Sequence, residues 1–119
     1  MHLDDRPGML AALSGVLAGA GVNIEALAGF GSGSEGRVHL IVDDEPAARE
    51  ALQEAGLRFQ ERSVISTLLP HRPGALAELT RGLAEAGVNI DAVYLVRTNS
   101  HGHEFALAVD RIDAARAVV

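Results

Sequence analysis

The sequence predicts an α+β protein built from one structural unit that occurs twice, with helices on one face of an antiparallel sheet. Two observations lead to this prediction. The segment "RPGMLAALSGVLAGAGVNI", which begins at Arg6, returns as "RPGALAELTRGLAEAGVNI" from Arg72, with 13 of 19 positions identical. In the same way "VDDEPAAR" from Val42 returns as "VDRIDAAR" from Val109. Because the repeat covers almost the whole chain, both halves should share one fold.

The first half of each repeat is predicted to form a helix followed by a strand. Pro7 and Pro73 suit the first turn of a helix, where a missing N–H costs nothing. Leucines then recur at helical spacing and form one apolar stripe per repeat: Leu10, Leu13 and Leu17, and Leu76, Leu79 and Leu83. Gly21 and Gly87 lie where a glycine ends a helix. The segments "VNIEALAGF" and "VNIDAVYLV" that follow have the length and the β-branched content of strands.

A glycine-rich loop comes next. "GSGSEG", residues 31–36, fits the G-x-G-x-x-G pattern of dinucleotide-binding loops. That fingerprint requires a strand, the loop and then a helix, whereas "RVHLIVDD" after this loop alternates apolar and polar residues as a strand does. We therefore expect a hairpin loop and no nucleotide cofactor. Its counterpart in the second repeat is "TNSHGH" from Thr98.

The second half of the repeat is predicted from "DDEPAAREALQEAG", a helix with Asp43 and Asp44 as possible caps and Gly56 at its end. "LRFQERSVISTLLP" then alternates and is predicted to supply two strands. One, around Leu57 to Arg62, would end the first repeat, and the other would begin the second. Each repeat is thus β-α-β-β-α-β, the ferredoxin-like order.

The predicted domains are residues 1–62 and 63–119. Val119 aligns with Leu52, so the second repeat lacks an evident last strand. Met1 aligns with Thr67, inside the first strand, which leaves a longer native N-terminus open. Because the missing strand would lie beside "SVISTLLP", that edge should be unpaired, and soluble proteins cover such edges. We therefore expect a homodimer, paired through this edge or through the second-strand edges.

Composition excludes several functions. The chain has 10 basic and 16 acidic residues and no basic cluster, which argues against nucleic-acid binding. It has no cysteine, no apolar run of membrane-spanning length and no secretory leader, so we expect a cytoplasmic protein without a membrane partner. His101 and His103 flank Gly102 in a hairpin tip, but without a clear third ligand we expect exposed loop histidines and no metal. No nucleophile lies near a base, so we expect no enzymatic activity.

The paired motifs "DRPGML" and "HRPGAL", each followed at fixed spacing by "AGVNI", resemble a tandem pair of ACT domains, the small-molecule sensing modules of amino-acid metabolism. The resemblance covers essentially the full chain. It implies a regulatory protein that binds a free amino acid where two modules meet, near the strand-to-helix turn of one and a strand of its neighbour. It also implies a target in trans, such as an amino-acid biosynthetic enzyme. The alternative is a ligand-free module for interaction or dimerisation.

The turn has a physical rationale of its own, because amides exposed at a helix start favour a carboxylate. Asn23 and Asn89 supply a donor and an acceptor, although capping of local turns is an equal alternative. Asp5 and His71 stand where the family often has Asn, which makes the two sites chemically unequal. The predicted ligand-binding residues are Asp5, Arg6, Pro7, Gly8, Met9, Leu10, Asn23 and Ile24, and His71, Arg72, Gly74, Ala75, Leu76, Asn89 and Ile90.

Overall fold

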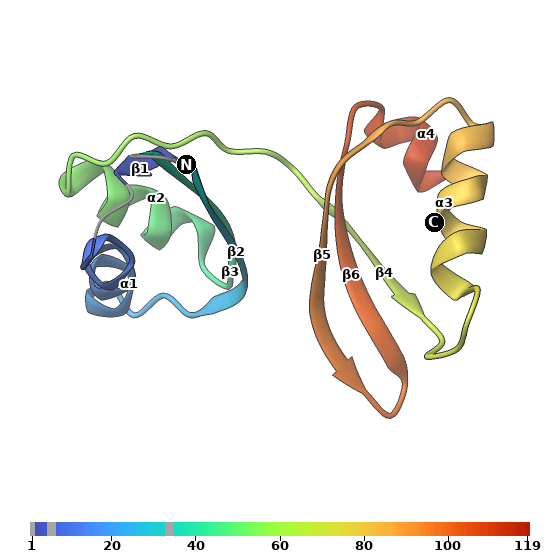
Figure 1. The fold of residues 1–119 in the computed structure, drawn as a ribbon, viewed down its shortest axis with the longest axis horizontal. Helices are drawn as coiled ribbons and strands as arrows, with labels where there is room; N and C mark the ends of the chain where they lie inside the picture. The colour runs from blue at the N-terminus through green and yellow to red at the C-terminus, as the bar shows by residue number, and fades with distance from the viewer. Residues whose placement is uncertain (1, 5–6, 33–34) are drawn as a thin grey trace. The chain divides into compact units, whose positions relative to one another are not determined.

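The computed structural model describes residues 2–4, 7–32 and 35–119, and the chain divides into two compact units, Met1–Glu61 and Arg62–Val119. The first unit contains β1 (His2–Asp4), α1 (Met9–Gly19), β2 (Ile24–Ser32), β3 (Glu35–Val42) and α2 (Glu45–Glu54). The second contains β4 (Ile65–Leu69), α3 (Ala75–Glu85), β5 (Ile90–Asn99), β6 (Gly102–Val109) and α4 (Ile112–Arg116). Figure 1 shows that both units follow the same order of elements.

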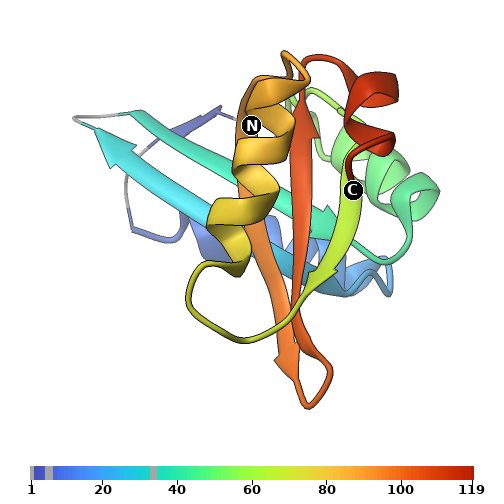
Figure 2. The ribbon, with the colours of Figure 1, turned by 90° about the vertical axis from the view of Figure 1, so that its right-hand side faces the viewer.

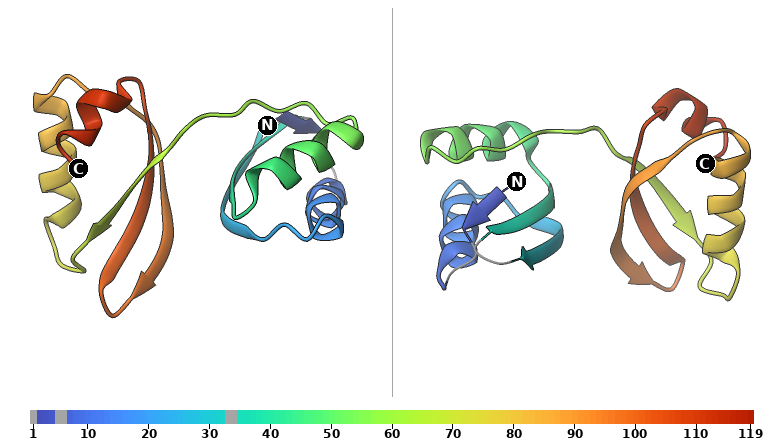
Figure 3. Two further views of the ribbon diagram at one scale, coloured as in Figure 1. Left: turned by 180° about the vertical axis from the view of Figure 1, so that it is seen from behind. Right: turned by 45° about the horizontal axis from the view of Figure 1, so that its top comes forward.

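Each unit has one antiparallel sheet of three strands, in the order β1-β3-β2 in the first unit and β4-β6-β5 in the second. The helices of a unit cover one face of its sheet. Figure 2 shows α3 crossing in front of the strands of the second unit, and Figure 3 shows α1 and α2 on the same face of the first sheet. The predicted α+β class, with helices on one face of antiparallel sheets, is therefore confirmed.

The cores confirm most of the predicted leucine stripe. Leu13 and Leu17 are buried in the first unit and Leu79 and Leu83 in the second. They pack against inward-facing strand residues, among them Val38 in one core and Ile65, Leu107 and Val109 in the other. The first leucine of each stripe departs from the prediction, because Leu10 is 48% exposed and Leu76 is 42% exposed. Each lies in the first helical turn, beyond the end of its core.

The glycine-rich loop joins two paired strands, as predicted. Gly31 pairs with Gly36, and Ser32 pairs with Glu35, at the closed end of the β2–β3 hairpin. The loop tip at residues 33–34 lies outside the described residues. Since β3 and not a helix follows the loop, the arrangement of a dinucleotide fingerprint is absent. In the second unit Asn99 pairs with Gly102 in the same way.

The predicted last strand of the first repeat is wrong, because residues 57–64 form no strand. Leu57 and Phe59 pack against the core of the first unit. Glu61 forms a bidentate ion pair with Arg49 of α2, at 2.6 Å between Glu61 Oε1 and Arg49 Nε. The alternating residues that predicted a strand thus hold this segment against α2. In the second unit, β4 is an edge strand that pairs only with β6 among the described residues.

Gly102→Ala should destabilise the second unit. Gly102 has φ of +131°, and a Cβ there would lie 2.1 Å from the carbonyl oxygen of Leu69. A positive φ and a backbone clash each cost on the order of 1–3 kcal/mol, so we expect a loss of about 2 kcal/mol or more in a denaturant titration. Ser100→Ala, in the same exposed turn, is the control and should change stability by less than about 0.5 kcal/mol. Equal stability of both variants would contradict the close packing of this hairpin on Leu69.

Candidate functional site

The two helix starts share an unusual cap. Gly8 precedes α1 with φ of 90°, Gly74 precedes α3 with φ of 89°, and neither helix has a capping side chain among the described residues. Both glycines are in the left-handed region, which side-chain-bearing residues rarely adopt. Their carbonyls accept the first helical hydrogen bonds, from Ala12 N and Glu78 N, each at 2.9 Å. The sequence therefore forms the same turn twice, and in the described residues neither helix start has a capping side-chain hydrogen bond.

The structure refines which amides are available. Ala75 N donates to the carbonyl oxygen of Arg72 at 3.4 Å, so the amides of the next two residues, Leu76 and Ala77, are the ones left for a ligand. Ala75 itself is buried, Met9 is half-buried, and Pro7, Leu10 and Leu76 are exposed beside the turns. The predicted site residues Asp5 and Arg6 lie outside the described residues.

His71, the residue before the second turn, contacts the β5–β6 hairpin. Its Nδ1 meets Nε2 of His103, and the two rings pack edge-on with centroids 4.1 Å apart. Nδ1 of His103 in turn shares a hydrogen bond of 2.8 Å with Oγ1 of Thr98. His103 lies in β6 and is half-buried, which corrects the expectation of an exposed loop histidine. His101 remains exposed at the hairpin tip.

Arg72 reaches over the first turn of α3 to Glu78. Nη2 and Nη1 of the arginine lie 3.0 Å and 3.4 Å from the two carboxylate oxygens of the glutamate. Both side chains are exposed, at 50% and 61%, and the hydrogen bond from Arg72 lowers the pKa of Glu78. Glu78 was not among the predicted site residues. A comparison of the two repeats could have drawn attention to Glu78, because the first repeat has an alanine, Ala12, at the equivalent position.

The two asparagines have a structural role through their backbones. Asn23 N donates to Asp43 Oδ1 at 2.9 Å while Asp43 N donates back to Asn23 O at 3.1 Å. Asn89 and Asp110 form the same reciprocal pair, at 2.8 Å and 3.1 Å. The first pair joins the residue before β2 to the residue after β3, and the second joins the residue before β5 to the residue after β6. Ile24 and Ile90 then begin β2 and β5 and pack against the cores.

The side chain of Asn89 joins a separate polar network. Its Nδ2 donates to Asp91 Oδ1 at 2.8 Å, and Arg62 Nη2 donates to the other carboxylate oxygen of Asp91 at 2.8 Å. Arg62 also donates to the carbonyl oxygen of Val109 at 3.0 Å. The hydrogen bonds from Arg62 and then Asn89 lower the pKa of Asp91.

Within a unit the structure does not bring the asparagine and the turn together. Gly74 begins α3 and Asn89 follows its end, so the 11-residue helix lies between them. At 1.5 Å per residue that helix is about 16 Å long. Gly8 and Asn23 are separated by α1, also of 11 residues, in the same way. The residues of each turn are neighbours of one another, and the asparagine–isoleucine pairs form a second group at the far end of the helix.

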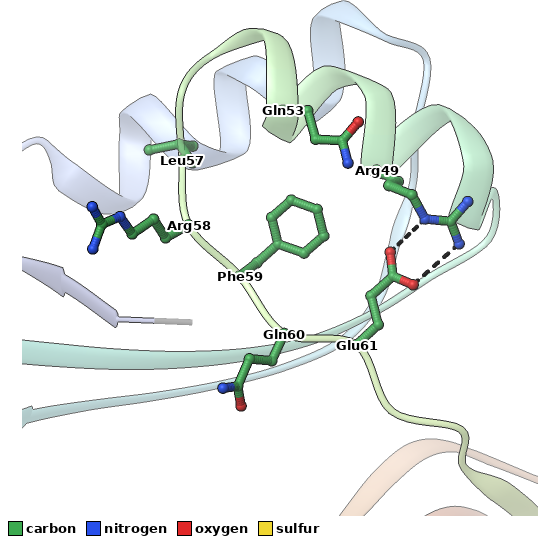
Figure 4. Close-up of a pocket in the computed structure, with 7 residues that line it drawn as sticks. All are labelled: Arg49, Gln53, Leu57, Arg58, Phe59, Gln60 and Glu61. Carbon is green, nitrogen blue, oxygen red and sulfur yellow. Dashed lines mark hydrogen bonds and ion pairs between the residues drawn. The ribbon is translucent and has the colours of Figure 1, made fainter.

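A cavity in the first unit is lined by none of the predicted site residues. It measures about 760 Å³ and is lined by Arg49, Gln53, Leu57, Arg58, Phe59, Gln60 and Glu61. Figure 4 shows the ring of Phe59 directed toward α2, with the Arg49–Glu61 ion pair beside it and Arg58 pointing away. This hollow lies beside α2 and the segment after it, away from the turn that precedes α1.

A second cavity, of about 290 Å³, does reach the predicted site. It lies in the second unit and is lined by Thr67, Leu69, Pro70, Arg72, Ala75, Glu78, Leu79, Val118 and Val119. Arg72 and Ala75 belong to the predicted turn. Of the two cavities, this one is the better candidate because it places an apolar surface beside a charged turn.

Metal binding and membrane spanning find no support in the described parts of the chain. Residues 2–4, 7–32 and 35–119 contain no group of three or more histidine, aspartate or glutamate side chains placed to hold a metal ion. None of the helices that these residues form is long and apolar enough to cross a membrane.

Comparison with known proteins agrees with the repeat. The family model described as the ACT domain matches residues 1–55 and again residues 63–118. The crystal structure of protein BT0572 from Bacteroides thetaiotaomicron matches with a TM-score of 0.89 and 26% identity, over 98% of this chain and 81% of that one. The ligand-free regulatory subunit of aspartate kinase from Thermus thermophilus matches with a TM-score of 0.68 and 22% identity, over 97% and 83% of the chains, which shows a shared fold. No curated protein matches the sequence significantly.

Asp110→Ala should destabilise the second unit more than Asn89→Ala does. The first change removes the acceptor of the Asn89 N–H, which costs about 1 kcal/mol. The second removes only an exposed side-chain hydrogen bond and should cost about 0.5 kcal/mol or less. Urea unfolding of both variants measures the difference. A larger loss from Asn89→Ala would mean that the asparagine side chain, and not its backbone, holds the strand start.

Proposed function

Because this chain belongs to the ACT domain family through both of its repeats, we propose that it is a regulatory module that binds a free amino acid without transforming it. The observation that supports this proposal is the glycine-capped helix start, which the chain forms twice with the same geometry. Two such turns at φ near 90° are costly for any residue but glycine. A turn retained in this form suits a role that needs uncovered backbone amides.

The chemistry of the turn fits the carboxylate of an amino acid. Uncapped amides and the positive end of the helix dipole both favour an anion. In the second unit the guanidinium of Arg72 adds a positive charge at the same turn, where its Nη1 donates to the carbonyl oxygen of Pro73 at 3.4 Å. The residues we assign to this role are Pro7, Gly8, Met9 and Leu10 with Asp5 and Arg6, and His71, Arg72, Gly74, Ala75 and Leu76. Asn23, Ile24, Asn89 and Ile90 can take part only from a neighbouring module, because the helix separates them from the turn of their own unit.

Regulation would act in trans on a cytoplasmic enzyme of amino-acid metabolism. One solved structure with the same fold is a regulatory subunit of aspartate kinase, an example of a regulatory chain separate from its catalytic chain. The alternative function is a module that dimerises and has lost its ligand. Exposed apolar strand residues favour an interaction surface for both the ligand-binding module and the ligand-free module.

A second copy of the chain is the partner that we propose, paired through β5. Val93 and Leu95 on this edge strand are 48% and 53% exposed. They stand opposite Leu107 and Phe105 in the ladder, so they lie on the face that the core uses. β5 has 10 residues, whereas β4, the other edge named as a possible pairing edge from the sequence, has only five and one strongly exposed leucine, Leu68. A long apolar edge requires cover in a soluble protein.

A thermal-shift screen of the common amino acids tests ligand binding. One amino acid should raise the unfolding temperature, because a ligand at about 100 times its dissociation constant adds about 2.7 kcal/mol of stability. The methyl ester of the same amino acid is the control, and it should give little shift because it lacks the carboxylate. A flat response to every amino acid at millimolar concentration would favour the ligand-free module.

Light scattering at micromolar concentration tests the assembly. The natural chain should have the mass of a dimer, and Leu95→Lys should have the mass of a monomer because it places a charge in the apolar edge. Leu68→Lys, an equivalent change on β4, is the matched control and should remain dimeric. A natural chain that is monomeric and stable on dilution would refute the dimer. The opposite pattern in the two variants would assign the pairing to β4.

A further inference from the structure

A groove runs along the open edge of the second sheet. One wall is β4, through Thr67 and Leu69, and the other is a single face of α3, through Ala75, Glu78 and Leu79. These three helix positions are spaced i, i+3 and i+4, so they project to the same side. β4 pairs only with β6 among the described residues, so its other edge has no strand partner there.

The C-terminal residues close one side of the groove. The amides of Val118 and Val119 both donate to the carbonyl oxygen of Ala115 at 3.0 Å, which folds them back after α4. Val118 packs so closely on α3 that a Cβ at Gly82 would lie 3.0 Å from its Cγ1. The glycine on the helix therefore allows the valine to approach. With Leu69, Pro70 and Leu79, these valines make much of the groove's lining apolar.

The mouth of the groove carries one positive and one negative group. Arg72 and Glu78 line it and form an exposed ion pair with each other. Exposed pairs of this kind contribute only about 0–1 kcal/mol, so a ligand can separate them at small cost. A zwitterion would replace the pair with two new ones, its carboxylate on Arg72 and its ammonium on Glu78. The exchange leaves no charge unpaired, and a guanidinium frequently binds a carboxylate through two parallel hydrogen bonds.

From this geometry we propose that the groove between β4 and α3 binds an aliphatic L-amino acid. Arg72 and the start of α3 hold its carboxylate, Glu78 accepts its ammonium, and the side chain lies against Leu69, Leu79 and Val118. A volume of about 290 Å³ accommodates a molecule of this size and lies near the lower end of ligand sites in general. This inference rests on the proposed function, since it names the ligand class and the residues of the same turn.

The inference also assigns the site to one repeat. Ala12 stands in the first repeat where the second has Glu78, so the first repeat has no carboxylate at this position of its helix. The cavity found in the first unit lies instead between α2 and residues 57–61. The chain should therefore bind one aliphatic amino acid per copy through this groove.

Isothermal calorimetry on the full chain, with L-leucine, L-isoleucine and L-valine compared with L-serine, L-aspartate and L-lysine, tests the proposal. The aliphatic ligands should bind more tightly, with one site per chain. Glu78→Gln should weaken binding of the best ligand at least 10-fold, while Glu85→Gln, the same change at the exposed end of α3, should leave affinity unchanged. Circular dichroism establishes that both variants are folded. Val118→Ser should reduce the preference for leucine over alanine.

An analogue without the ammonium group separates the role of Glu78 from a general loss of charge. For leucine the analogue is 4-methylpentanoate, which should bind the natural chain weakly. It should bind Glu78→Gln equally weakly, because loss of the ligand's ammonium and loss of the Glu78 carboxylate remove the same contact. Binding of an amino acid that is unaffected by Glu78→Gln, or a preference for polar ligands, would overturn this inference and leave the proposed function standing. No binding of any amino acid would overturn both. Dissociation of a dimer by Glu78→Gln would show that a second copy occupies the groove.

Discussion

Each unit has to close its hydrophobic core with only about 60 residues, a size at which a single core is marginal. The leucines of the first helix in each unit contribute much of this core. Leu17 and Leu83 are completely buried, and Leu13 and Leu79 nearly so. Burying a leucine side chain contributes about 1.5–3 kcal/mol. Their packing fixes the rotation of α1 and α3 about their axes, and every other feature of the candidate site follows from that orientation.

Once the helix is fixed, its first turn has to lie beyond the core. Leu10 and Leu76 continue the leucine stripe by sequence but are 48% and 42% exposed. The chain enters each helix from a strand through a glycine with φ near 90°. Such an entry provides no capping side chain, so the helix-start amides face outward. The same constraint that buries two leucines therefore places a helix start without a side-chain cap at the surface of each unit.

The two units diverge in the residues around that shared turn. In the second unit Arg72 is paired with Glu78 and His71 contacts His103 of β6. Ala12 replaces the glutamate in the first unit, where the segment after α2 is held by Phe59 and by the ion pair of Arg49 with Glu61. A repeat preserves the scaffold because both copies need the same core, whereas surface side chains are free to differ. The difference between the surroundings of the two turns follows from that freedom.

The sequence by itself determined the features that depend on local patterns and on the repeat. These are the order of helices and strands apart from the last strand of the first repeat, the presence of a helix after each Arg-Pro-Gly motif, the hairpin at residues 31–36, and the buried leucines. Local spacing decides each of them, because helices and strands have fixed periods. The site residues before the second helix could be proposed from the same motif, but their partners could not.

Only the tertiary structure decided where the alternating segment after α2 goes and what surrounds Arg72. Residues 57–61 have the pattern of a strand, yet Leu57 and Phe59 find the core and Glu61 finds Arg49. Asn89, predicted as a ligand contact, lies beyond the far end of α3 from Gly74 and binds Asp91. The groove beside β4 joins residues from a strand, a helix and the C-terminal turn. Contacts between segments so distant in the chain depend on packing in three dimensions, which no local period encodes.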